Sequence, residues 1–274
     1  MSPKLLLLIL IFIIHSFYLK MENNSKIKIM CMGDSITFGH KMPGSYRKFL
    51  YHNLLLKGHK IKMVGAKDNK ISKYYYGKDN SNFFEYEDDN SGFSAYTICS
   101  FGIRKGLLEL LHQNKCLKLN PNIIILLIGT NNIMENYDFI KTKNDFINLI
   151  NYILNNISKE TMLFIGTIPD MDPNTEIVYK WFNNYRKENY DDNKIKKMVN
   201  DNVDKFNNEI KKIVENYRNN NYNNIRIENL NGAIKDIDKY LFDGVHPNND
   251  GYKVMGEFWS EIVDNYLKEK NEYK

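Results

Sequence analysis

The sequence predicts one α/β domain in three layers, in which a doubly wound, parallel, five-stranded sheet lies between two layers of helices. Three observations lead to this fold class. Segments with strand patterns alternate with helical segments, one strand is almost entirely apolar, and no linker rich in Pro, Gly or Ser divides the chain. About 250 residues follow an apolar leader, which is enough for a single large domain.

The first half of the chain contains two predicted strands, two helices and a long loop. Residues 26–32 begin by alternating basic and apolar side chains and run into a glycine, as expected for a strand. A helix over 46–57 and a strand over 60–64 follow. A long polar loop then leads to a helix over 103–114.

The second half contains a central strand and a long amphipathic helix. Residues 122–128 are almost all apolar, which indicates a strand buried on both faces. A helix over 138–155 and a strand over 162–168 come next, and a strand over 224–230 and a helix over 251–268 end the domain. Between them, apolar residues recur every three or four positions and form one helical stripe for the core. These residues are Ile195, Met198, Val199, Val203, Phe206, Ile210, Ile213, Val214 and Tyr217.

Two motifs far apart in the chain offer the groups of a serine nucleophile site. The first strand runs into Gly33-Asp34-Ser35-Ile36, so Ser35 should lie at the carboxyl end of a strand, where open α/β sheets place their chemistry. Near the other terminus, Asp243 precedes His246 by three residues. A carboxylate at that spacing can hold the imidazole Nδ1–H while Nε2 faces the serine. We predict Ser35 as nucleophile, His246 as base and Asp243 as the group that orients it.

A third segment is expected to face the same crevice. The central strand stops at Gly129-Thr130-Asn131, and its polar carboxyl end should lie beside Ser35. An asparagine amide at this position can donate a hydrogen bond to a developing oxyanion.

Together these segments resemble the conserved blocks of the SGNH (GDSL-like) hydrolases. The matching segments are Gly33-Asp34-Ser35-Ile36, residues 92–98, Gly129-Thr130-Asn131 and Asp243-Gly244-Val245-His246. Residues 44–47 and 247–252 look most like the acetylxylan esterases of carbohydrate esterase family 3. The resemblance implies an SGNH hydrolase domain over 26–270 with a flavodoxin-like sheet.

The resemblance also implies an oxyanion hole built from the backbone N–H groups of Ser35 and Ala95 and the side-chain amide of Asn131. Ala95 stands where the family usually has glycine. Alanine keeps the N–H, so we expect the donor to be retained. The backbone at Ala95 would be free of strain only if its φ were negative. Asn132 replaces the usual aspartate at a position that supports the loop.

Four further residues are candidates for substrate contacts: Asp34, His40, Tyr96 and Trp181. His40 follows the serine by five residues in the exit loop, and Trp181 lies in an aromatic segment, predicted as a loop, whose rings could stack on sugars. None of the other histidines follows an acid by three residues in a motif at the end of a strand. No metal or other cofactor is expected, because neither His-x-x-x-His nor Cys-x-x-Cys spacing occurs.

The amino terminus predicts export. Leu5 to Ile14 are ten consecutive apolar residues, a length suited to a signal peptide within residues 1–20 and short for a membrane span. No Ala-x-Ala-like cleavage site follows, so an uncleaved membrane anchor is the alternative to a secreted, extracellular protein. Of the three cysteines, Cys99 and Cys116 are the pair considered for a disulfide.

Charge and composition limit the partners. A formal net charge of +5 is too balanced to indicate nucleic acid as a partner, and we expect a monomer. No membrane partner is expected unless the leader stays uncleaved. The expected partner is an acetylated polysaccharide or oligosaccharide as substrate.

The function predicted from these residues and from the resemblance is a serine esterase that deacetylates xylan or a related plant polysaccharide through an acyl-enzyme. One alternative is a lipid or thioester hydrolase, similar to a lysophospholipase, which should have an apolar acyl groove. Another is a non-catalytic carbohydrate-binding surface protein on the same scaffold. Nucleotide binding is disfavoured because no Gly-x-Gly-x-x-Gly or Walker loop follows the first strand.

Overall fold

The computed structural model describes residues 5, 26–67, 71–135, 138–184 and 192–272. The predicted leader lies outside these residues apart from Leu5, so the choice between signal peptide and anchor stays a prediction. None of the helices in the described ranges combines the length and hydropathy that a membrane span requires.

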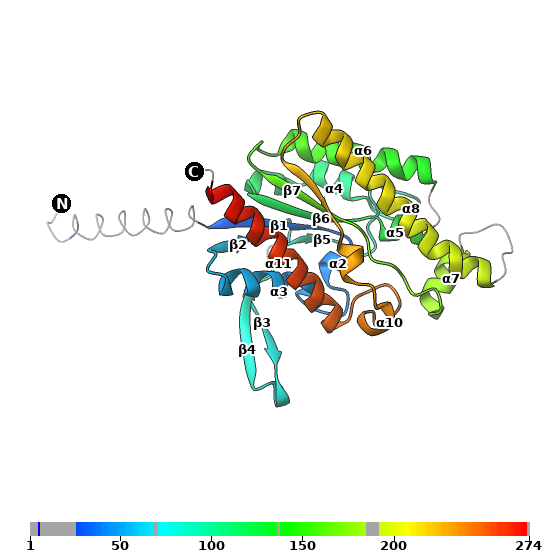
Figure 1. The fold of residues 1–274 in the computed structure, drawn as a ribbon, viewed down its shortest axis with the longest axis horizontal. Helices are drawn as coiled ribbons and strands as arrows, with labels where there is room; N and C mark the ends of the chain where they lie inside the picture. Colours follow the sequence, from blue (N-terminus) through cyan, green and yellow to red (C-terminus); the bar gives the residue numbers. More distant parts are fainter. Residues whose placement is uncertain (1–4, 6–25, 68–70, 136–137, 185–191, 273–274) are drawn as a thin grey trace.

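A parallel sheet with the order β2-β1-β6-β7-β8 lies at the centre of the molecule (Figure 1). Its strands are β1 (Ile27–Gly33), β2 (Ile61–Met63), β6 (Ile123–Leu127), β7 (Met162–Gly166) and β8 (Ile225–Glu228). The five predicted strands and the doubly wound α/β class are confirmed. A two-residue strand that was not predicted, β5 (Ser91–Gly92), also pairs with β1.

The most apolar strand lies in the middle of the sheet, as its sequence indicates. All five residues of β6 are buried, and β6 pairs with β1 in register from Ile29–Ile123 to Gly33–Leu127. This pairing brings the carboxyl ends of the two strands together, and with them the segments that follow each strand.

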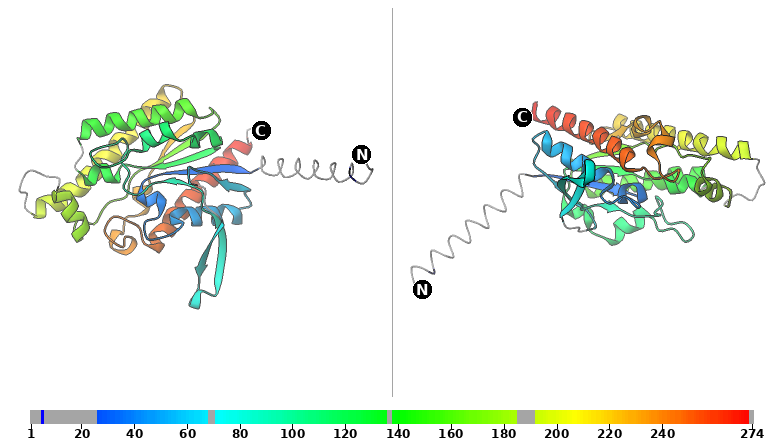
Figure 2. Two further views of the ribbon diagram at one scale, coloured as in Figure 1. Left: turned by 180° about the vertical axis from the view of Figure 1, so that it is seen from behind. Right: turned by 90° about the horizontal axis from the view of Figure 1, so that it is seen from below.

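Helices cover both faces of the sheet (Figure 2). On one face α3 (Ser45–Leu56) packs against α11 (Asn249–Glu272); on the other, α6 (Phe139–Asn156) packs against α4 (Leu107–Gln113) and α8 (Asp192–Asn219). The apolar stripe of α8 is buried from Ile195 to Val214, apart from the partly buried Met198. The short helices are α2 (Ser35–Phe38), α5 (Thr130–Met134), α7 (Glu176–Asn184), α9 (Leu230–Ala233), α10 (Ile237–Tyr240), η1 (Lys78–Asn80) and η2 (Cys116–Leu119).

Two segments predicted as loops are regular structure. The polar loop contains an antiparallel hairpin of β3 (Ile71–Tyr76) and β4 (Asn82–Glu87), which projects from the domain in Figure 1. One of its faces packs on α3, where Phe84 stacks on His52 at 4.0 Å between ring centroids. The aromatic residues of these strands stand in consecutive runs, Tyr74-Tyr75-Tyr76 and Phe83-Phe84, so no alternation in the sequence indicated the hairpin. The segment containing Trp181 is helix α7 rather than a loop.

The cysteines form no disulfide. Cys31, Cys99 and Cys116 are all buried and free, so the pairing of Cys99 with Cys116 is wrong. Burial raises the pKa of the Cys99 thiol to about 12, mainly because a thiolate would lose its hydration there. These side chains therefore act as small apolar core residues.

Candidate active site

The nucleophile turn, residues 33–36, joins β1 to α2 under tight steric limits. A Cβ at Gly33 would lie 1.9 Å from the carbonyl oxygen of Leu127 on β6, so only glycine allows the two strand ends to approach this closely. The Asp34 carboxylate accepts a hydrogen bond from the N–H of Ile36 (3.0 Å) and caps α2. Ser35, the first residue of α2, is thereby held at the carboxyl end of the sheet, with 8% of its surface exposed.

The Asp–His loop, residues 243–246, approaches from the other end of the chain. Asp243 Oδ1 accepts hydrogen bonds from the backbone N–H groups of Val245 (3.0 Å) and His246 (2.8 Å), which fixes the loop around its carboxylate. Gly244 has φ +85°, and a Cβ there would lie 2.1 Å from the Thr175 hydroxyl. The loop therefore needs glycine at this position.

Ser35, His246 and Asp243, here called the triad, form one hydrogen-bonded chain. The Ser35 hydroxyl lies 2.8 Å from His246 Nε2, and His246 Nδ1 lies 2.8 Å from Asp243 Oδ2. The carboxylate can only accept from Nδ1–H, which leaves the Nε2 lone pair to receive the serine proton. This is the arrangement that a general base needs to activate a serine for attack.

The charges around the triad suit these roles. Burial acts to raise the pKa of Asp243, but hydrogen bonds from the His246 ring and backbone outweigh it, so the pKa lies below its usual value. Asp243 is therefore an anion at neutral pH and can stabilise an imidazolium. Asp34 is different: complete burial outweighs its hydrogen bond from Ile36 and raises its pKa to about 6.

The structure brings the predicted oxyanion donors to the same end of the sheet. Asn131, in α5, donates one amide hydrogen to the carbonyl of Tyr96 (2.8 Å), which ties α5 to the segment holding Ala95 and leaves the second hydrogen available. Within the described part of the chain, the backbone N–H groups of Ser35 and Ala95 have no acceptor. Their role as oxyanion donors stays a prediction.

Ala95 adopts a strained backbone conformation. Its φ is +65°, in the left-handed region, so the condition for an unstrained alanine, a negative φ, is not met. A residue with a Cβ costs about 1–2 kcal/mol there. The neighbouring loop is supported by Asn132, whose side-chain oxygen accepts from the N–H of Ile98 (3.1 Å).

The four candidate substrate residues have different surroundings. Asp34 is fully buried and caps α2, whereas His40 lies beside the triad with its ring centroid 4.6 Å from that of His246. The Tyr96 ring packs against Phe93 at 5.0 Å. Trp181 is 38% exposed on α7, and substrate contact by any of the four is untested.

Two residues around the triad were missed at the sequence level. Phe242 stacks on the His246 ring at 5.9 Å. Arg47, in α3, is only 1% exposed and donates to the carbonyls of Thr37 (2.9 Å) and Phe38 (3.2 Å) at the end of α2, while its guanidinium pairs with Asp88. An arginine within an apolar helical segment was the available signal, because a buried cation needs a partner.

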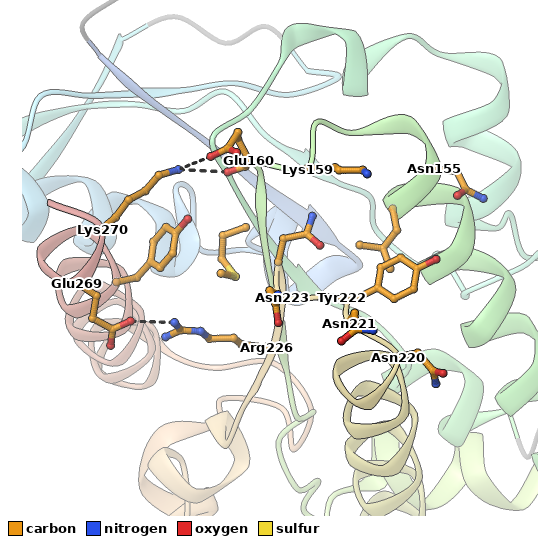
Figure 3. A pocket seen from close by; sticks show the side chains of 14 residues that line it. Asn155, Lys159, Glu160, Asn220, Asn221, Tyr222, Asn223, Arg226, Glu269 and Lys270 are labelled. Carbon is orange, nitrogen blue, oxygen red and sulfur yellow. Dashed lines mark hydrogen bonds and ion pairs between the residues drawn. The ribbon is translucent and has the colours of Figure 1, made fainter. Parts of the chain in front are cut away.

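A separate hollow lies at the opposite end of the sheet. This amino-end hollow, of about 790 Å³, is formed by the amino ends of β7 and β8 and the carboxyl ends of α6, α8 and α11 (Figure 3). Its lining residues include no serine, cysteine or histidine. It therefore holds no nucleophile and base for acyl transfer.

Comparisons with known proteins identify the family of the chain. The model of the GDSL-like lipase/acylhydrolase family matches residues 29–259. A multidomain esterase from Ruminococcus flavefaciens is 33% identical over 249 residues, which cover 88% of this chain but only 29% of that protein.

Solved structures show the same fold. A family 3 carbohydrate esterase from Clostridium thermocellum has a TM-score of 0.58 at 22% identity, covering 89% of this chain and 98% of that one. One from Talaromyces cellulolyticus has a TM-score of 0.58 at 15% identity, covering 89% of this chain and 99% of that one. The predicted resemblance is thus confirmed, and the chain belongs to the GDSL-like lipase/acylhydrolase family.

Proposed function

We propose that this chain is a serine esterase that removes acetyl groups from xylan or a related plant polysaccharide. The observation that carries the proposal is the hydrogen-bonded triad, with 2.8 Å from Ser35 Oγ to His246 Nε2 and 2.8 Å from His246 Nδ1 to Asp243 Oδ2. A serine, a base and a carboxylate in this order form the constellation for acyl transfer.

The reaction proceeds through a covalent ester of Ser35. His246 takes the hydroxyl proton as Ser35 attacks the ester carbonyl, then gives it to the departing sugar hydroxyl. A water deprotonated by His246 releases acetate. The N–H groups of Ser35 and Ala95 and the Asn131 amide stabilise the oxyanion in both steps.

Several features support a small acyl group on a carbohydrate. Neither of the two hollows described, the amino-end hollow and one between α6 and α8, adjoins Ser35, so neither serves as an acyl groove for a long chain. Trp181 is partly exposed, with the Arg104 guanidinium 5.1 Å from its ring, and presents an aromatic surface of the kind that stacks on sugars. The two solved relatives are named as carbohydrate esterases of family 3. An extracellular polymer as substrate also agrees with the expected secretory leader, so we propose secretion.

Acetate release from acetylated xylan tests the proposal. Wild type should release acetate from the xylan, and it should hydrolyse nitrophenyl acetate faster than long-chain nitrophenyl esters. Ser35→Ala should neither release acetate nor hydrolyse the nitrophenyl esters. Ser158→Ala is a matched control, since Ser158 lies next to the amino-end hollow and accepts only a local hydrogen bond from the Glu160 N–H (3.2 Å). Fast long-chain cleavage without acetate release would indicate a lipid hydrolase. Xylan binding without any ester cleavage would indicate a carbohydrate-binding protein.

The sugar platform can be tested separately. Trp181→Ala should raise KM for acetylated xylan severalfold and leave nitrophenyl acetate hydrolysis unchanged, because the small ester does not reach α7. Tyr222→Ala, which removes an equally exposed aromatic ring at the other end of the sheet, is the control. Equal KM values for wild type and Trp181→Ala on the polymer would remove Trp181 from the substrate site.

A further inference from the structure

His40, Asp243 and His246 bring three metal-ligating side chains together at the carboxyl end of the sheet. Each offers one ligand atom, and these atoms all lie within 4.8 Å of one another. The sequence lacks the His-x-x-x-His and Cys-x-x-Cys spacings of zinc sites, but these spacings describe only ligands that are close together in the sequence. Here the fold supplies His40 from the loop after α2 and His246 from the Asp–His loop, near the other end of the chain.

The two histidine rings lie against one another, which places a nitrogen of each within 4.8 Å of the other and of an Asp243 oxygen. Their centroids are 4.6 Å apart and the ring planes are inclined by 37°. All three residues are partly exposed, although only 16% of the His246 side chain and 11% of the Asp243 side chain reach solvent, so an incoming cation must shed water to bind. Phe242 stacks on His246 at 5.9 Å and on His40 at 6.5 Å, which restricts the rings near this geometry.

The donor set selects the kind of cation. Two imidazole nitrogens and one carboxylate oxygen suit Zn²⁺, whose bonds to such ligands are about 2.0–2.2 Å long. Mg²⁺ and Ca²⁺ prefer oxygen ligands in greater number. Ligand atoms of a tetrahedral ion with such bonds lie about 3.4 Å apart, so side chains whose ligand atoms lie within 4.8 Å of one another must draw together to bind it, with water as the fourth ligand.

From this geometry we propose that the chain binds one Zn²⁺ through His40, Asp243 and His246, and that the bound ion reversibly inhibits the triad. At His246 Nε2 the metal occupies the lone pair that receives the Ser35 proton. At Nδ1 it displaces the proton to Nε2, which then donates toward Ser35 and cannot accept from it. In either case the base is lost without any covalent change.

Binding can be measured without catalysis, which separates this inference from the proposed function. Calorimetric titration of full-length Ser35→Ala with ZnCl₂ at pH 7.5 should give one site per chain, and MgCl₂ should give none. Adding His40→Gln should weaken Zn²⁺ binding at least about tenfold, because one of three ligands is lost. His112→Gln in the same background is the matched control, since His112 lies on α4, outside the triad, and its ring packs against that of Tyr152 on α6.

Inhibition of the active enzyme is the second readout. Zn²⁺ should abolish turnover of nitrophenyl acetate by wild type, EDTA should restore it, and His40→Gln should need at least about tenfold more Zn²⁺. Each variant is normalised to its own metal-free rate. Equal Zn²⁺ affinity in the His40→Gln and His112→Gln proteins, or no binding to Ser35→Ala, would overturn the proposal. Binding as expected in a chain without esterase activity would uphold the metal site and reject the proposed function.

Discussion

The two ends of the parallel sheet both carry polar side chains, but they arrange them differently. At the carboxyl end, the triad comes from segments 211 positions apart and forms one half-buried hydrogen-bonded chain. At the amino end, four of the charged side chains that line the amino-end hollow form two ion pairs. Arg226 pairs with Glu269 at 2.8 Å, and Lys270 pairs with Glu160 at 3.5 Å (Figure 3).

This difference shows that convergence of reactive groups, rather than the size of a hollow, locates the chemistry. The amino-end hollow has ample volume and charge, yet no nucleophile lies beside a base there. The carboxyl end instead has a serine hydroxyl held 2.8 Å from His246 Nε2. Substitutions at matched positions of the two ends should therefore have very unequal effects.

The largest expected effect is on turnover. Ser35→Ala should lower kcat for nitrophenyl acetate by at least about ten-thousandfold, because the covalent step is lost. Ser158→Ala, at the amino end, should stay within about twofold of wild type. The comparison fails if both variants keep similar rates.

The buried and exposed arginine pairs should differ in the free energy of unfolding. Arg47→Met should lower it by about 3–5 kcal/mol, since the variant leaves a carboxylate and two α2 carbonyls without their cation. Arg226 is 33% exposed, and Arg226→Met should lower stability by less than about 1 kcal/mol. Urea unfolding of both variants measures this difference, and equal losses would contradict it.

Loss of the oxyanion amide should be smaller than loss of the nucleophile. Asn131→Ala should lower kcat by about a hundred- to a thousandfold with little change in KM, because the amide acts on charge that develops in the transition state. Asn220→Ala, in the amino-end hollow, should leave kcat unchanged. A change confined to KM in Asn131→Ala would place the amide in ground-state binding instead.

Asp34 predicts a pH dependence of stability. Its pKa is raised from 3.8 to about 6, so the folded chain binds more protons than the unfolded chain between these values, and stability falls as the pH rises through this window. The loss of unfolding free energy through this window is at most about 3 kcal/mol. Asp34→Asn keeps the cap of α2 but cannot ionise, so the variant should not show this loss. Unfolding at pH 4, 5, 6 and 7 measures the slope. Asp236→Asn, at the exposed cap of α10, is the control, and equal slopes in wild type and Asp34→Asn would refute the burial effect.

The smallest expected effect concerns backbone strain. Ala95→Gly should raise the free energy of unfolding by about 1 kcal/mol, because glycine accepts φ +65° without a Cβ clash. Ala66→Gly, at a position without a positive φ, should lower stability slightly through the greater freedom of the unfolded chain. Thermal unfolding of the pair tests this, and a loss of stability in Ala95→Gly would show that the strain is absent.

Much of the fold could be predicted from local patterns. The strands appeared as apolar runs ending at glycine, and α8 as one stripe of core residues, because both signals are set by residues close in sequence. The hairpin of β3 and β4 was missed because its aromatic residues stand in consecutive runs, Tyr74-Tyr75-Tyr76 and Phe83-Phe84, and show no strand-like alternation. Helix α7 was missed for a similar reason.

The site divides in the same way. The members of the triad lie in short motifs that could be recognised singly, and their meeting was expected from the chemistry of these motifs and from the family resemblance. Neither the contact of His40 with His246 nor the positive φ of Ala95 could be predicted, because both depend on how loops pack in three dimensions. Residues 44–47 were matched to the family, but the role of Arg47 was not predicted, because its partners are backbone carbonyls and Asp88, which lie outside that motif.

Covalent labelling tests the central claim most directly. Wild type treated with an organophosphate probe and mapped by peptide mass spectrometry should carry the label on Ser35. The label should be lost in Ser35→Ala and form far more slowly in His246→Ala, because the base activates the hydroxyl. A label on another residue, or labelling of Ser35 at the same rate without His246, would contradict the triad as the reacting centre.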